Sequence, residues 1–364
     1  MKINIIGPFP PPYGGISVHV KRMMLYLINN NVEVTIYNEA KNYSENSKNI
    51  RTIGSYKNFI FKIPFLKGDT IHFHTISKKI RILMGLFKIF NKKIVLTIHG
   101  ESLHDQLEES NWISKKLLLF SMNKIDKIVC VNSNIINELI CLGISNEKLS
   151  YIPAFINPIE NEQDFKNIHQ NVWNFINNSD FLISSNGWVR FYNKQDLYGI
   201  DMLIELIRKL KDAGYNISLL IALLGTNMEN DSEKLYYEDL KNKIKEYNLQ
   251  SNIMFFEVKD TEFYPILKKS KLFLRPTNTD GDAVSIREAL YYKVPTIASD
   301  IVKRPEGTII FRTRDIEDLY IKTIDVIENY NLYKEKINDI KQTNNFEKLL
   351  EVYKELIYRE EMKG

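Results

Sequence analysis

The chain has 364 residues, of which 44% are hydrophobic and 26% are charged, and its formal net charge is +4. This balance is that of a soluble globular protein, and it excludes a disordered or fibrous chain. Only two cysteines are present, which excludes a disulfide framework and a four-cysteine zinc site and favours a reducing compartment. The length exceeds what one ordinary hydrophobic core can hold, so we expect two domains.

The first 160 residues are the basic part of the chain, with 20 Lys and Arg against 12 Asp and Glu. In segment 78–93 lysines interleave with Ile, Leu, Met and Phe, as in a helix that lies on an anionic membrane surface. The alternative, which we favour, is a helix that buries one side on its own sheet while its lysines are solvated. No recognition motif for nucleic acid accompanies these residues, so nucleic acid is not an expected partner.

Short β-branched runs alternate with helical segments along the chain, which is typical of parallel βαβ units. The first set of expected strands is 2–6, 33–37, 70–74, 93–98, 127–131 and 149–153, with helices over 17–27, 78–90, 113–122 and 134–142. The second set is 181–185, 217–224, 253–256, 271–275, 296–298 and 308–311, with helices over 199–212, 232–247, 261–268 and 285–292.

An Asn-rich polar stretch, 157–178, lies between these two sets. The pattern predicts two Rossmann-like, doubly wound α/β domains over 1–160 and 161–343. Residues 344–364 would form a C-terminal helix that can pack back on the N-terminal domain. No apolar run is long enough for a secretory signal or a membrane span, so the expected location is the cytoplasm. In open parallel sheets ligands bind beyond the carboxyl ends of the strands, so the loops there are the places to search.

The loop after the first strand carries prolines and the pair Gly14-Gly15 before a helix. Such a turn exposes backbone N–H groups at a helix N-terminus, where they can hold a phosphate or a sugar hydroxyl. The alternative is a plain strand-to-helix turn. The position directly after the first strand favours the binding interpretation of Gly14 and Gly15.

Three histidines stand at the ends of two apolar strands. His72 and His74 alternate onto one face, so one of them can be buried in the sheet. His99, followed by Gly100, is the better candidate for donating a hydrogen bond to a sugar hydroxyl or a phosphate oxygen. Their spacing does not indicate a metal triad, so we expect no metal there.

The strongest signal is the segment 277–290, TNTDGDAVSIREAL, in which a small-residue turn leads into a helix. The N–H groups of Ala283, Val284 and Ser285 can receive a diphosphate at the positive end of that helix. Glu288 can accept hydrogen bonds from ribose hydroxyls, and Asp280 can reach hydroxyls of a sugar.

Two other interpretations of this segment are possible from the sequence. In the first, Asp280 is only a helix N-cap and Glu288 is a solvated surface residue. In the second, Asp280 and Asp282 form a pair that binds a divalent metal. We do not favour the metal pair, because it would open a late helix in a second domain.

At this point the sequence resembles the retaining glycosyltransferases of family 4, which have the GT-B fold. Asp280 and Glu288 are eight positions apart, like the two glutamates of that family's donor-site signature. Gly14-Gly15 resembles its first-loop glycines, and His74 and His99 resemble the histidines that follow two of its N-domain strands. Segment 186–190 resembles the start of its second domain.

The resemblance implies two Rossmann-like domains that face each other across a cleft. It also implies that Arg190 contacts the donor diphosphate together with a lysine. Tyr198 occupies the position of that lysine, and Lys194 is its candidate replacement. Asp280 is one methylene shorter than the usual glutamate.

The implied activity is transfer of a sugar from a nucleotide-sugar, with a UDP- or GDP-sugar as the expected donor, and with retention of anomeric configuration. Arg190, Lys194 and the N–H groups of 283–285 would stabilise the leaving diphosphate, so no cofactor and no divalent metal are expected. His99 would orient the sugar, and His74 would stand on the acceptor side.

The basic first domain favours a glycan or lipid-linked acceptor of surface polysaccharide assembly. It also favours peripheral contact with an anionic membrane, at the inner face of the plasma membrane. Two alternatives remain open: a nucleotide-sugar epimerase on the same fold, and a catalytically silent module that binds sugar or membrane.

Overall fold

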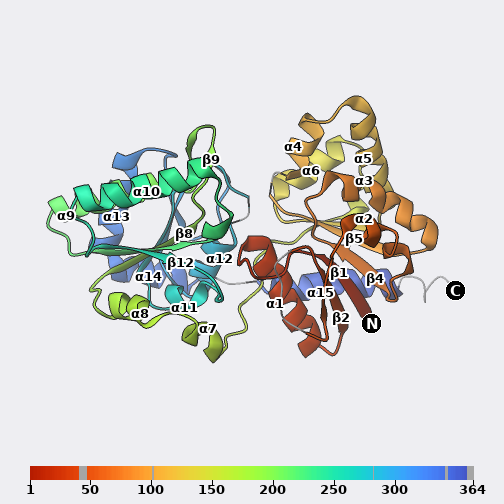
Figure 1. Cartoon of the computed structure of the whole chain (residues 1–364), viewed down its shortest axis with the longest axis horizontal. Helices are drawn as coiled ribbons and strands as arrows, with labels where there is room; N and C mark the ends of the chain where they lie inside the picture. Colours follow the sequence, from red (N-terminus) through yellow and green to blue (C-terminus); the bar gives the residue numbers. More distant parts are fainter. Residues whose placement is uncertain (41–46, 101, 282, 341–342, 359–364) are drawn as a thin grey trace. The chain divides into compact units, whose positions relative to one another are not determined.

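The computed structural model describes residues 1–40, 47–100, 102–281, 283–340 and 343–358 (Figure 1). The contacts divide the chain into two compact units. The first comprises Met1–Ile159 and Thr343–Gly364, and the second comprises Glu160–Gln342. Asp282, the second member of the metal pair considered above, lies outside the described residues. No helix in the described ranges has both the length and the apolar character to cross a bilayer.

The first unit is built on a seven-stranded parallel sheet with the order β3-β2-β1-β4-β5-β6-β7. Its strands are β1 (Lys2–Gly7), β2 (Glu33–Asn38), β3 (Ile50–Thr52), β4 (Thr70–Phe73), β5 (Lys93–Ile98), β6 (Lys127–Cys130) and β7 (Leu149–Tyr151). The six strands expected from the sequence are confirmed. The edge strand β3 is additional, and its three residues are too short for a periodic signal.

Helices cover both faces of this sheet. Successive side chains of β5 point to opposite faces and enter two different cores. Ile94, Leu96 and Ile98 pack with α3, α5 and α6, whereas Val95 packs with α1 and α15. The helices are α1 (Gly15–Asn29), α2 (Tyr56–Ile60), α3 (Lys78–Phe87), α4 (Ser102–Glu108), α5 (Trp112–Lys124), α6 (Ser133–Cys141) and α15 (Asn345–Tyr358). Short 3₁₀ turns are η1 (Ile63–Phe65), η2 (Lys88–Phe90) and η3 (Asn146–Lys148). The C-terminal helix α15 is therefore part of the first unit.

The second unit has a six-stranded parallel sheet with the order β12-β11-β8-β13-β14-β15. The strands are β8 (Leu182–Gly187), β11 (Ser218–Leu223), β12 (Ile253–Glu257), β13 (Leu272–Arg275), β14 (Thr296–Ser299) and β15 (Thr308–Phe311). An antiparallel hairpin of β9 (Phe191–Tyr192) and β10 (Gln195–Asp196) follows β8. All six strands of the second expected set are confirmed.

The helices of the second unit also lie on both faces of its sheet, since Leu219 and Ile221 of β11 enter one core and Leu220 enters another. They are α7 (Glu162–Lys166), α8 (Gln170–Asn177), α9 (Ile200–Asp212), α10 (Asp231–Glu246), α11 (Tyr264–Leu267), α12 (Val284–Tyr291), α13 (Ile316–Glu328) and α14 (Tyr330–Asn338), with the 3₁₀ turn η4 (Thr226–Met228). The helix expected over 261–268 is shortened to the single turn α11.

Both sheets reverse their strand order at one point, as doubly wound nucleotide-binding domains do. In the first unit the reversal lies between β1 and β4, and in the second it lies between β8 and β13. Loops that leave these neighbouring strands diverge to opposite faces and leave a crevice at the carboxyl edge. The fold thus marks one candidate ligand position in each unit.

Candidate active site

The glycine pair follows β1, one of the two strands at the reversal in the first unit. Gly14 is the N-cap of α1, with extended backbone at φ −148°, and its N–H donates to Oγ of Ser17 at 2.9 Å. At Gly15, a Cβ built on the backbone meets no described atom within 4 Å. Packing therefore does not require glycine at position 15, and the open space beside it is available to a ligand. The binding role of both glycines stays a prediction.

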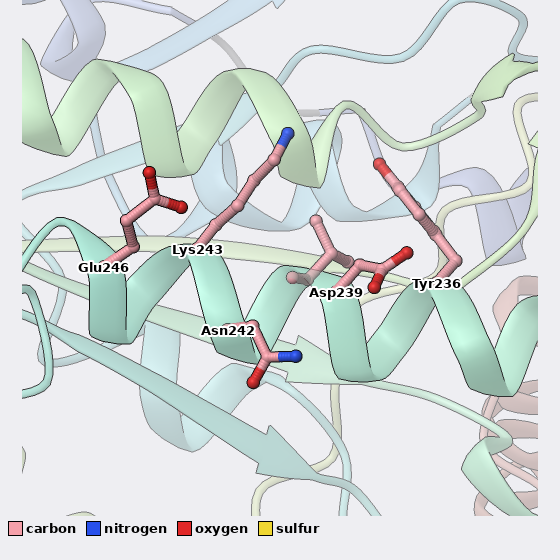
Figure 2. Close-up of a pocket in the computed structure, with 6 residues that line it drawn as sticks. Tyr236, Asp239, Asn242, Lys243 and Glu246 are labelled. Atoms are coloured by element: carbon pink, nitrogen blue, oxygen red, sulfur yellow. The ribbon is translucent and has the colours of Figure 1, made fainter.

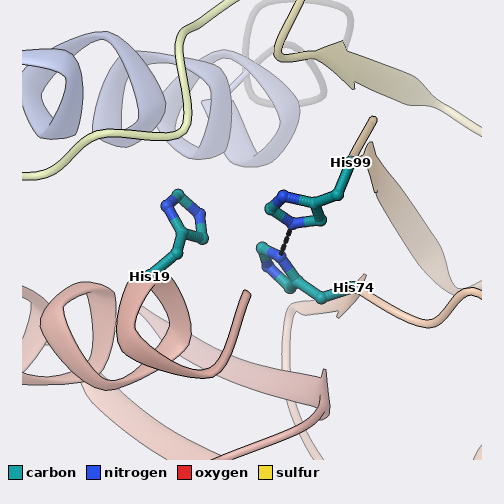
Figure 3. A group of neighbouring side chains, drawn as sticks. All are labelled: His19, His74 and His99. Atoms are coloured by element: carbon teal, nitrogen blue, oxygen red, sulfur yellow. Dashed lines mark hydrogen bonds between the residues drawn. The ribbon is translucent and has the colours of Figure 1, made fainter. Parts of the chain in front are cut away.

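His74 and His99 lie together at the carboxyl edge of the same sheet, directly after β4 and β5. Nδ1 of His74 and Nε2 of His99 are 3.0 Å apart, so one ring nitrogen donates to the other (Figure 3). Gly7 of β1 lets His74 approach, because a Cβ there would lie 2.8 Å from Cβ of His74. The two predicted histidines therefore form one hydrogen-bonded pair, which strand alternation alone could not reveal.

His19 of α1 completes this group and was missed from the sequence. Its ring centroid lies 5.2 Å from that of His74 and 5.3 Å from that of His99 (Figure 3). Nδ1 of His19 donates to the carbonyl oxygen of Ala154 at 2.5 Å, so Nε2 carries the lone pair of the neutral ring. Among the described residues, Nε2 of His19 and Nε2 of His74 are buried without a hydrogen-bond partner.

His72 lies inside β4, two residues before His74. Its Nδ1 lies 2.5 Å from the Tyr353 hydroxyl of α15, and its Nε2 lies 2.7 Å from Oγ1 of Thr97. Both ring nitrogens are thus satisfied inside the protein. The sequence indicated that one of the two histidines can be buried in the sheet. The structure buries both, and His72 is the one that uses both ring nitrogens inside the protein.

The whole histidine group is uncharged at neutral pH. Burial lowers the pKa of His19 to about 4, an effect that its hydrogen bond to Ala154 opposes and the Arg22 charge reinforces. Burial, with the proximity of the other imidazoles, also lowers the pKa values of His74 and His99 well below 6.5. Neutral imidazoles can each donate one hydrogen bond and accept another, which suits binding of sugar hydroxyls.

The same group is also where a metal ion could bind in the first unit. One ring nitrogen from each of His19, His74 and His99 lies within 4.8 Å of the others. Neutral imidazole is the form that binds transition metals. Nothing in the described contacts requires an ion, since His74 and His99 already pair with each other. The expectation that no metal is needed stays a prediction.

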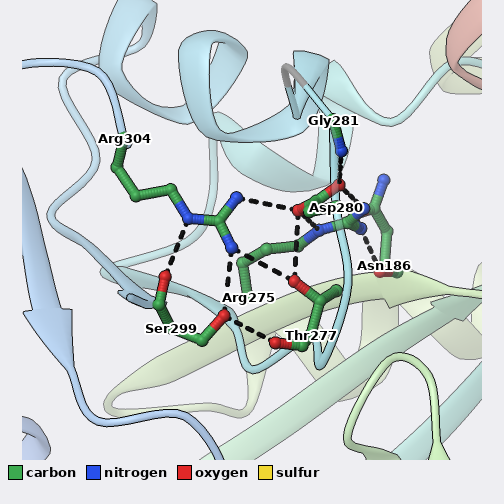
Figure 4. Close-up of polar contacts among 7 residues, drawn as sticks. All are labelled: Asn186, Arg275, Thr277, Asp280, Gly281, Ser299 and Arg304. Atoms are coloured by element: carbon green, nitrogen blue, oxygen red, sulfur yellow. Dashed lines mark hydrogen bonds and ion pairs between the residues drawn. The ribbon is translucent and has the colours of Figure 1, made fainter. Parts of the chain in front are cut away.

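In the second unit, Asp280 follows β13 and lies inside an ionic network (Figure 4). Its Oδ2 is 2.9 Å from Nη1 of Arg304 and 3.2 Å from Nε of Arg275, and it also accepts from Oγ1 of Thr277 at 3.1 Å. Burial alone would raise the pKa of this carboxyl. The charges of Arg275 and Arg304 outweigh burial and hold the pKa below its usual 3.8.

This network joins the two strands at the reversal of the second sheet. Arg275 donates from Nη1 to the backbone oxygen of Asn186 in β8 at 3.0 Å, and its guanidinium lies 4.9 Å from the centroid of the Tyr198 ring. Arg304 donates from Nε to the Ser299 carbonyl oxygen at 2.8 Å (Figure 4). The two guanidinium groups and the one carboxylate of this network together carry a net charge of +1. Asp280 is thus held in place by the protein, and its contact with sugar stays a prediction.

The interpretation of Asp280 as a plain N-cap with a solvated Glu288 is wrong. The N-cap of α12 is Ala283, which contributes no side-chain cap, and Asp280 lies outside the helix. Glu288 is buried, with 4% of its surface exposed. A carboxylate is rarely buried at this level without a partner, so Glu288 is a structural or binding group and not a surface residue.

The backbone of 283–285 forms the start of α12, as the sequence predicted. Ala283 and Ser285 are buried, and Val284 is partly exposed. The N–H groups of a first helical turn point outward along the axis, and the helix dipole gives them positive potential. This end of α12 is therefore suited to an anion, and whether a diphosphate binds there stays a prediction.

Arg190 and Lys194 lie on the exposed hairpin that follows β8. The Arg190 guanidinium is exposed and stacks over the Trp188 ring, 4.6 Å from its centroid. Lys194 is at the tip of the β9–β10 turn, where Asn193 and Lys194 both have positive φ. Such a two-residue turn with both φ values positive is a type I′ hairpin turn. Both cations thus extend from the loop at the reversal, and their contact with phosphate stays a prediction.

Arg275 and Arg304 were missed as members of the site. Arg275 looked like the last residue of an apolar strand, and Arg304 lies in a loop 24 residues after Asp280. A buried carboxylate requires a cationic partner, so Asp280 itself was the signal that could have prompted a search for them.

A separate hollow lies along α10 (Figure 2). Its lining consists of Tyr236, Asp239, Leu240, Asn242, Lys243 and Glu246. None of the predicted site residues lines it.

Two family models match the chain. The model described as Glycosyltransferase Family 4 matches residues 13–160, and the model described as Glycosyl transferases group 1 matches residues 193–343. Together they span most of both units. No curated protein matches the chain in sequence.

Solved structures resemble the chain over nearly its full length. A glycosyltransferase of Rickettsia africae is 17% identical, with a TM-score of 0.67 and 98% of each chain covered. Anabaena HepE in complex with UDP-glucose is 13% identical, with a TM-score of 0.68 and 100% of each chain covered. A Listeria monocytogenes protein assigned as a UDP-N-acetylglucosamine 2-epimerase is 14% identical, with a TM-score of 0.66 and coverage of 97% of this chain and 96% of that one. These similarities establish the shared two-domain fold.

Proposed function

We propose that this chain, which belongs to glycosyltransferase family 4 and has the GT-B fold, moves a sugar from a nucleotide-sugar donor to a glycan or lipid-linked acceptor with retention of anomeric configuration. The observation that carries the proposal is the carboxyl edge of the second sheet. There the buried Asp280 network leaves a net positive charge next to the uncapped start of α12. A nucleoside diphosphate is the anion that such an edge of a nucleotide-binding domain suits.

The second unit is assigned to the donor. Breaking the anomeric C–O bond leaves positive charge on the sugar and negative charge on the diphosphate. Arg190, Lys194 and the N–H groups of 283–285 are assigned to the diphosphate, and Glu288 to the ribose hydroxyls. Anabaena HepE binds UDP-glucose on the same fold, which supports a UDP-sugar, with a GDP-sugar as the other candidate.

The first unit is assigned to the acceptor and the transferred sugar, through His74, His99 and the Gly14-Gly15 loop. For retention, the acceptor oxygen attacks the face from which the diphosphate departs. Its proton passes to a phosphate oxygen of the leaving group, and the oxygen–anomeric carbon bond forms as the carbon–phosphate oxygen bond breaks. No carboxylate nucleophile is then required, and Asp280 is assigned to sugar hydroxyls.

The proposal requires no divalent metal, because cationic side chains and backbone N–H groups neutralise the leaving group. Transfer is expected to proceed at an unchanged rate in excess chelator. A chelator-sensitive rate that Zn²⁺ restores would instead assign an ion to His19, His74 and His99.

The acceptor is proposed to be membrane-borne, as in the assembly of a surface polysaccharide on a lipid carrier. The basic first unit would then bring the enzyme to the inner face of the plasma membrane as a peripheral protein. The base and the sugar of the donor are identified by screening nucleotide-sugars for a rise in melting temperature, since a ligand that binds the native state stabilises it by mass action.

An epimerase is the second candidate, because a structure assigned to a 2-epimerase shares the fold over nearly the full chain. The decisive experiment follows nucleotide release from a set of UDP- and GDP-sugars with and without extracts of lipid-linked acceptors. Transfer predicts nucleotide release only when acceptor is present, and a labelled sugar that moves into the lipid fraction. Conversion of the donor sugar to its epimer without acceptor would overturn the proposal.

A further inference from the structure

The first unit exposes an unusual number of large apolar side chains on neighbouring elements. Phe61 and Phe65 are 76% and 73% exposed, Ile89 is 79% exposed and Trp112 is 66% exposed. Single exposed apolar residues are ordinary, but a group on adjoining elements marks an interaction surface. The group, here called the basic aromatic face, consists of these four residues with Leu86, Phe90, Ile113, Leu117 and Phe120, and of the two lysines Lys116 and Lys124.

These residues come from elements that contact one another. The rings of Phe65 and Phe90 meet edge to face, with centroids 5.8 Å apart, which joins η1 to η2. Helices α3 and α5 pack closely, since the Gly85 N–H donates to Oγ of Ser121 at 2.8 Å and a Cβ at Gly85 would lie 2.8 Å from Cα of Ser121. The basic aromatic face is therefore continuous in the fold and not a scatter of sites.

Helix α5 carries the clearest outward apolar stripe. Ile113, Leu117 and Phe120 recur at the spacing of one helix face and are about half exposed, whereas Leu118 and Met122 are buried on the opposite side. Helix α3 buries Ile80 and Met84 against the sheet, as the favoured sequence interpretation required. Its C-terminal end and η2 nonetheless expose apolar residues, so burial on the sheet explains only part of that segment.

The charges on the outer side of α5 are basic. Lys116 lies over the Trp112 ring at 4.7 Å and Lys124 over the Phe120 ring at 5.5 Å. The sequence holds no Asp or Glu between positions 70 and 100 or between 111 and 125. Lysines with apolar stems and charged ends beside aromatic rings match the boundary between anionic headgroups and acyl chains. A second copy of this face would meet like charges, which disfavours self-association.

We infer that the basic aromatic face docks on an anionic lipid bilayer, with the rings of α5 and η2 entering the headgroup boundary. A hydrogen bond connects helix α3 to the candidate acceptor site. Arg81 of α3 donates from Nε to the carbonyl oxygen of Thr75, the residue that follows His74. Its purpose rests on the proposed lipid-linked acceptor, but the docking itself does not depend on the transferase activity.

The test measures co-sedimentation of the full chain with phosphatidylcholine vesicles that contain or lack phosphatidylglycerol. The wild-type chain is expected to bind only the anionic vesicles, and increasing salt is expected to weaken binding. The triple variant Ile113→Ser, Leu117→Ser, Phe120→Ser is expected to lower the bound fraction at least about tenfold, and the double variant Lys116→Glu, Lys124→Glu likewise.

The matched control replaces three exposed apolar residues of the second unit, Leu235→Ser, Ile321→Ser and Leu332→Ser, and should bind as the wild type does. Nucleotide release with a water-soluble acceptor should be unchanged in all variants, which separates failure of docking from failure of the proposed function. Absence of wild-type binding to anionic vesicles, or equal binding by the α5 variants, would overturn the inference. A wild-type dimer in light scattering that the α5 triple variant loses would also overturn it, in favour of a second copy.

Discussion

The carboxylate of Asp280 and the guanidinium of Arg304 form a buried ion pair, with Oδ2 and Nη1 2.9 Å apart and the arginine side chain 2% exposed. Arg275 shares the same carboxylate from the other side. The three buried charges stabilise one another. Each of them buried alone would lose more hydration free energy than its remaining contacts return.

Asp280→Asn is expected to destabilise the protein by about 3–5 kcal/mol, because it leaves two buried guanidinium groups without their counter-ion. Chemical denaturation of the full chain measures this loss. The control Asp212→Asn removes a carboxylate that only makes an exposed pair with Arg208 and should cost little. Since the folded pKa of Asp280 is depressed, its contribution is present above about pH 3.8 and is lost as the pH falls through the folded pKa. Equal stability of Asp280→Asn and the control would refute this account.

The histidine group predicts acid sensitivity in a milder range. Burial lowers the pKa of His19 to about 4 in the folded protein. Between pH 6.5 and 4 its imidazole is therefore protonated in the unfolded chain and neutral in the folded one. Stability is therefore complete above about pH 6.5 and falls as the pH drops toward 4, by up to roughly 3 kcal/mol from this residue. In His19→Asn an amide N–H can still donate to Ala154, and the slope of stability against pH should become shallower.

Gly15 and Gly7 should respond differently to the same substitution. Gly15→Ala places a methyl group in open space and, by restricting the unfolded chain, should hold or raise stability by up to about 1 kcal/mol. Its transfer rate should nonetheless fall, if a ligand occupies that space. Gly7→Ala should lower the melting temperature, because its Cβ would press on His74. A fully active Gly15→Ala enzyme would remove the glycine loop from the proposed site.

Arg190→Ala is expected to lower the transfer rate by about 10²–10³ with an unchanged melting temperature, since an exposed cation that stabilises a leaving group is lost. Arg208→Ala, an exposed arginine on α9, is the matched control and should retain the wild-type rate.

Glu288→Ala should also abolish most transfer. Because Glu288 is buried, Glu288→Gln is measured beside it, so that loss of the carboxylate is separated from loss of packing. Near-normal transfer in Arg190→Ala would contradict the assignment.

The sequence predicted the strands well because parallel strands are short apolar runs with an unambiguous pattern, as in 93–98 and 217–224. It also placed His74, His99 and Asp280 at the carboxyl ends of strands, where chain order alone determines the position. Partners that meet only through the tertiary fold were out of reach. His19 looked like one residue of an amphipathic helix, Arg304 sat in a loop without periodicity, and Tyr353 was 281 residues away from His72.

The solvent exposure of individual side chains was the other property that the sequence pattern did not determine. Segment 78–90 was compatible with a buried side and with a membrane-facing side, and the structure shows buried apolar residues and exposed apolar residues on the same segment. Glu288 is the opposite case. A charged residue within a helix is expected to be solvated from the sequence alone, and only the tertiary fold reveals that neighbouring elements bury it.

The way α15 completes the first unit affects how the chain matures on the ribosome. Phe346, Leu349 and Tyr353 fill the same core as Ile3 and Ile5 of β1. A nascent chain of residues 1–159 consequently has only α1 on this face of its sheet and lacks the part of the core that α15 supplies. The first unit therefore cannot complete its core until the ribosome has synthesised the whole of the second.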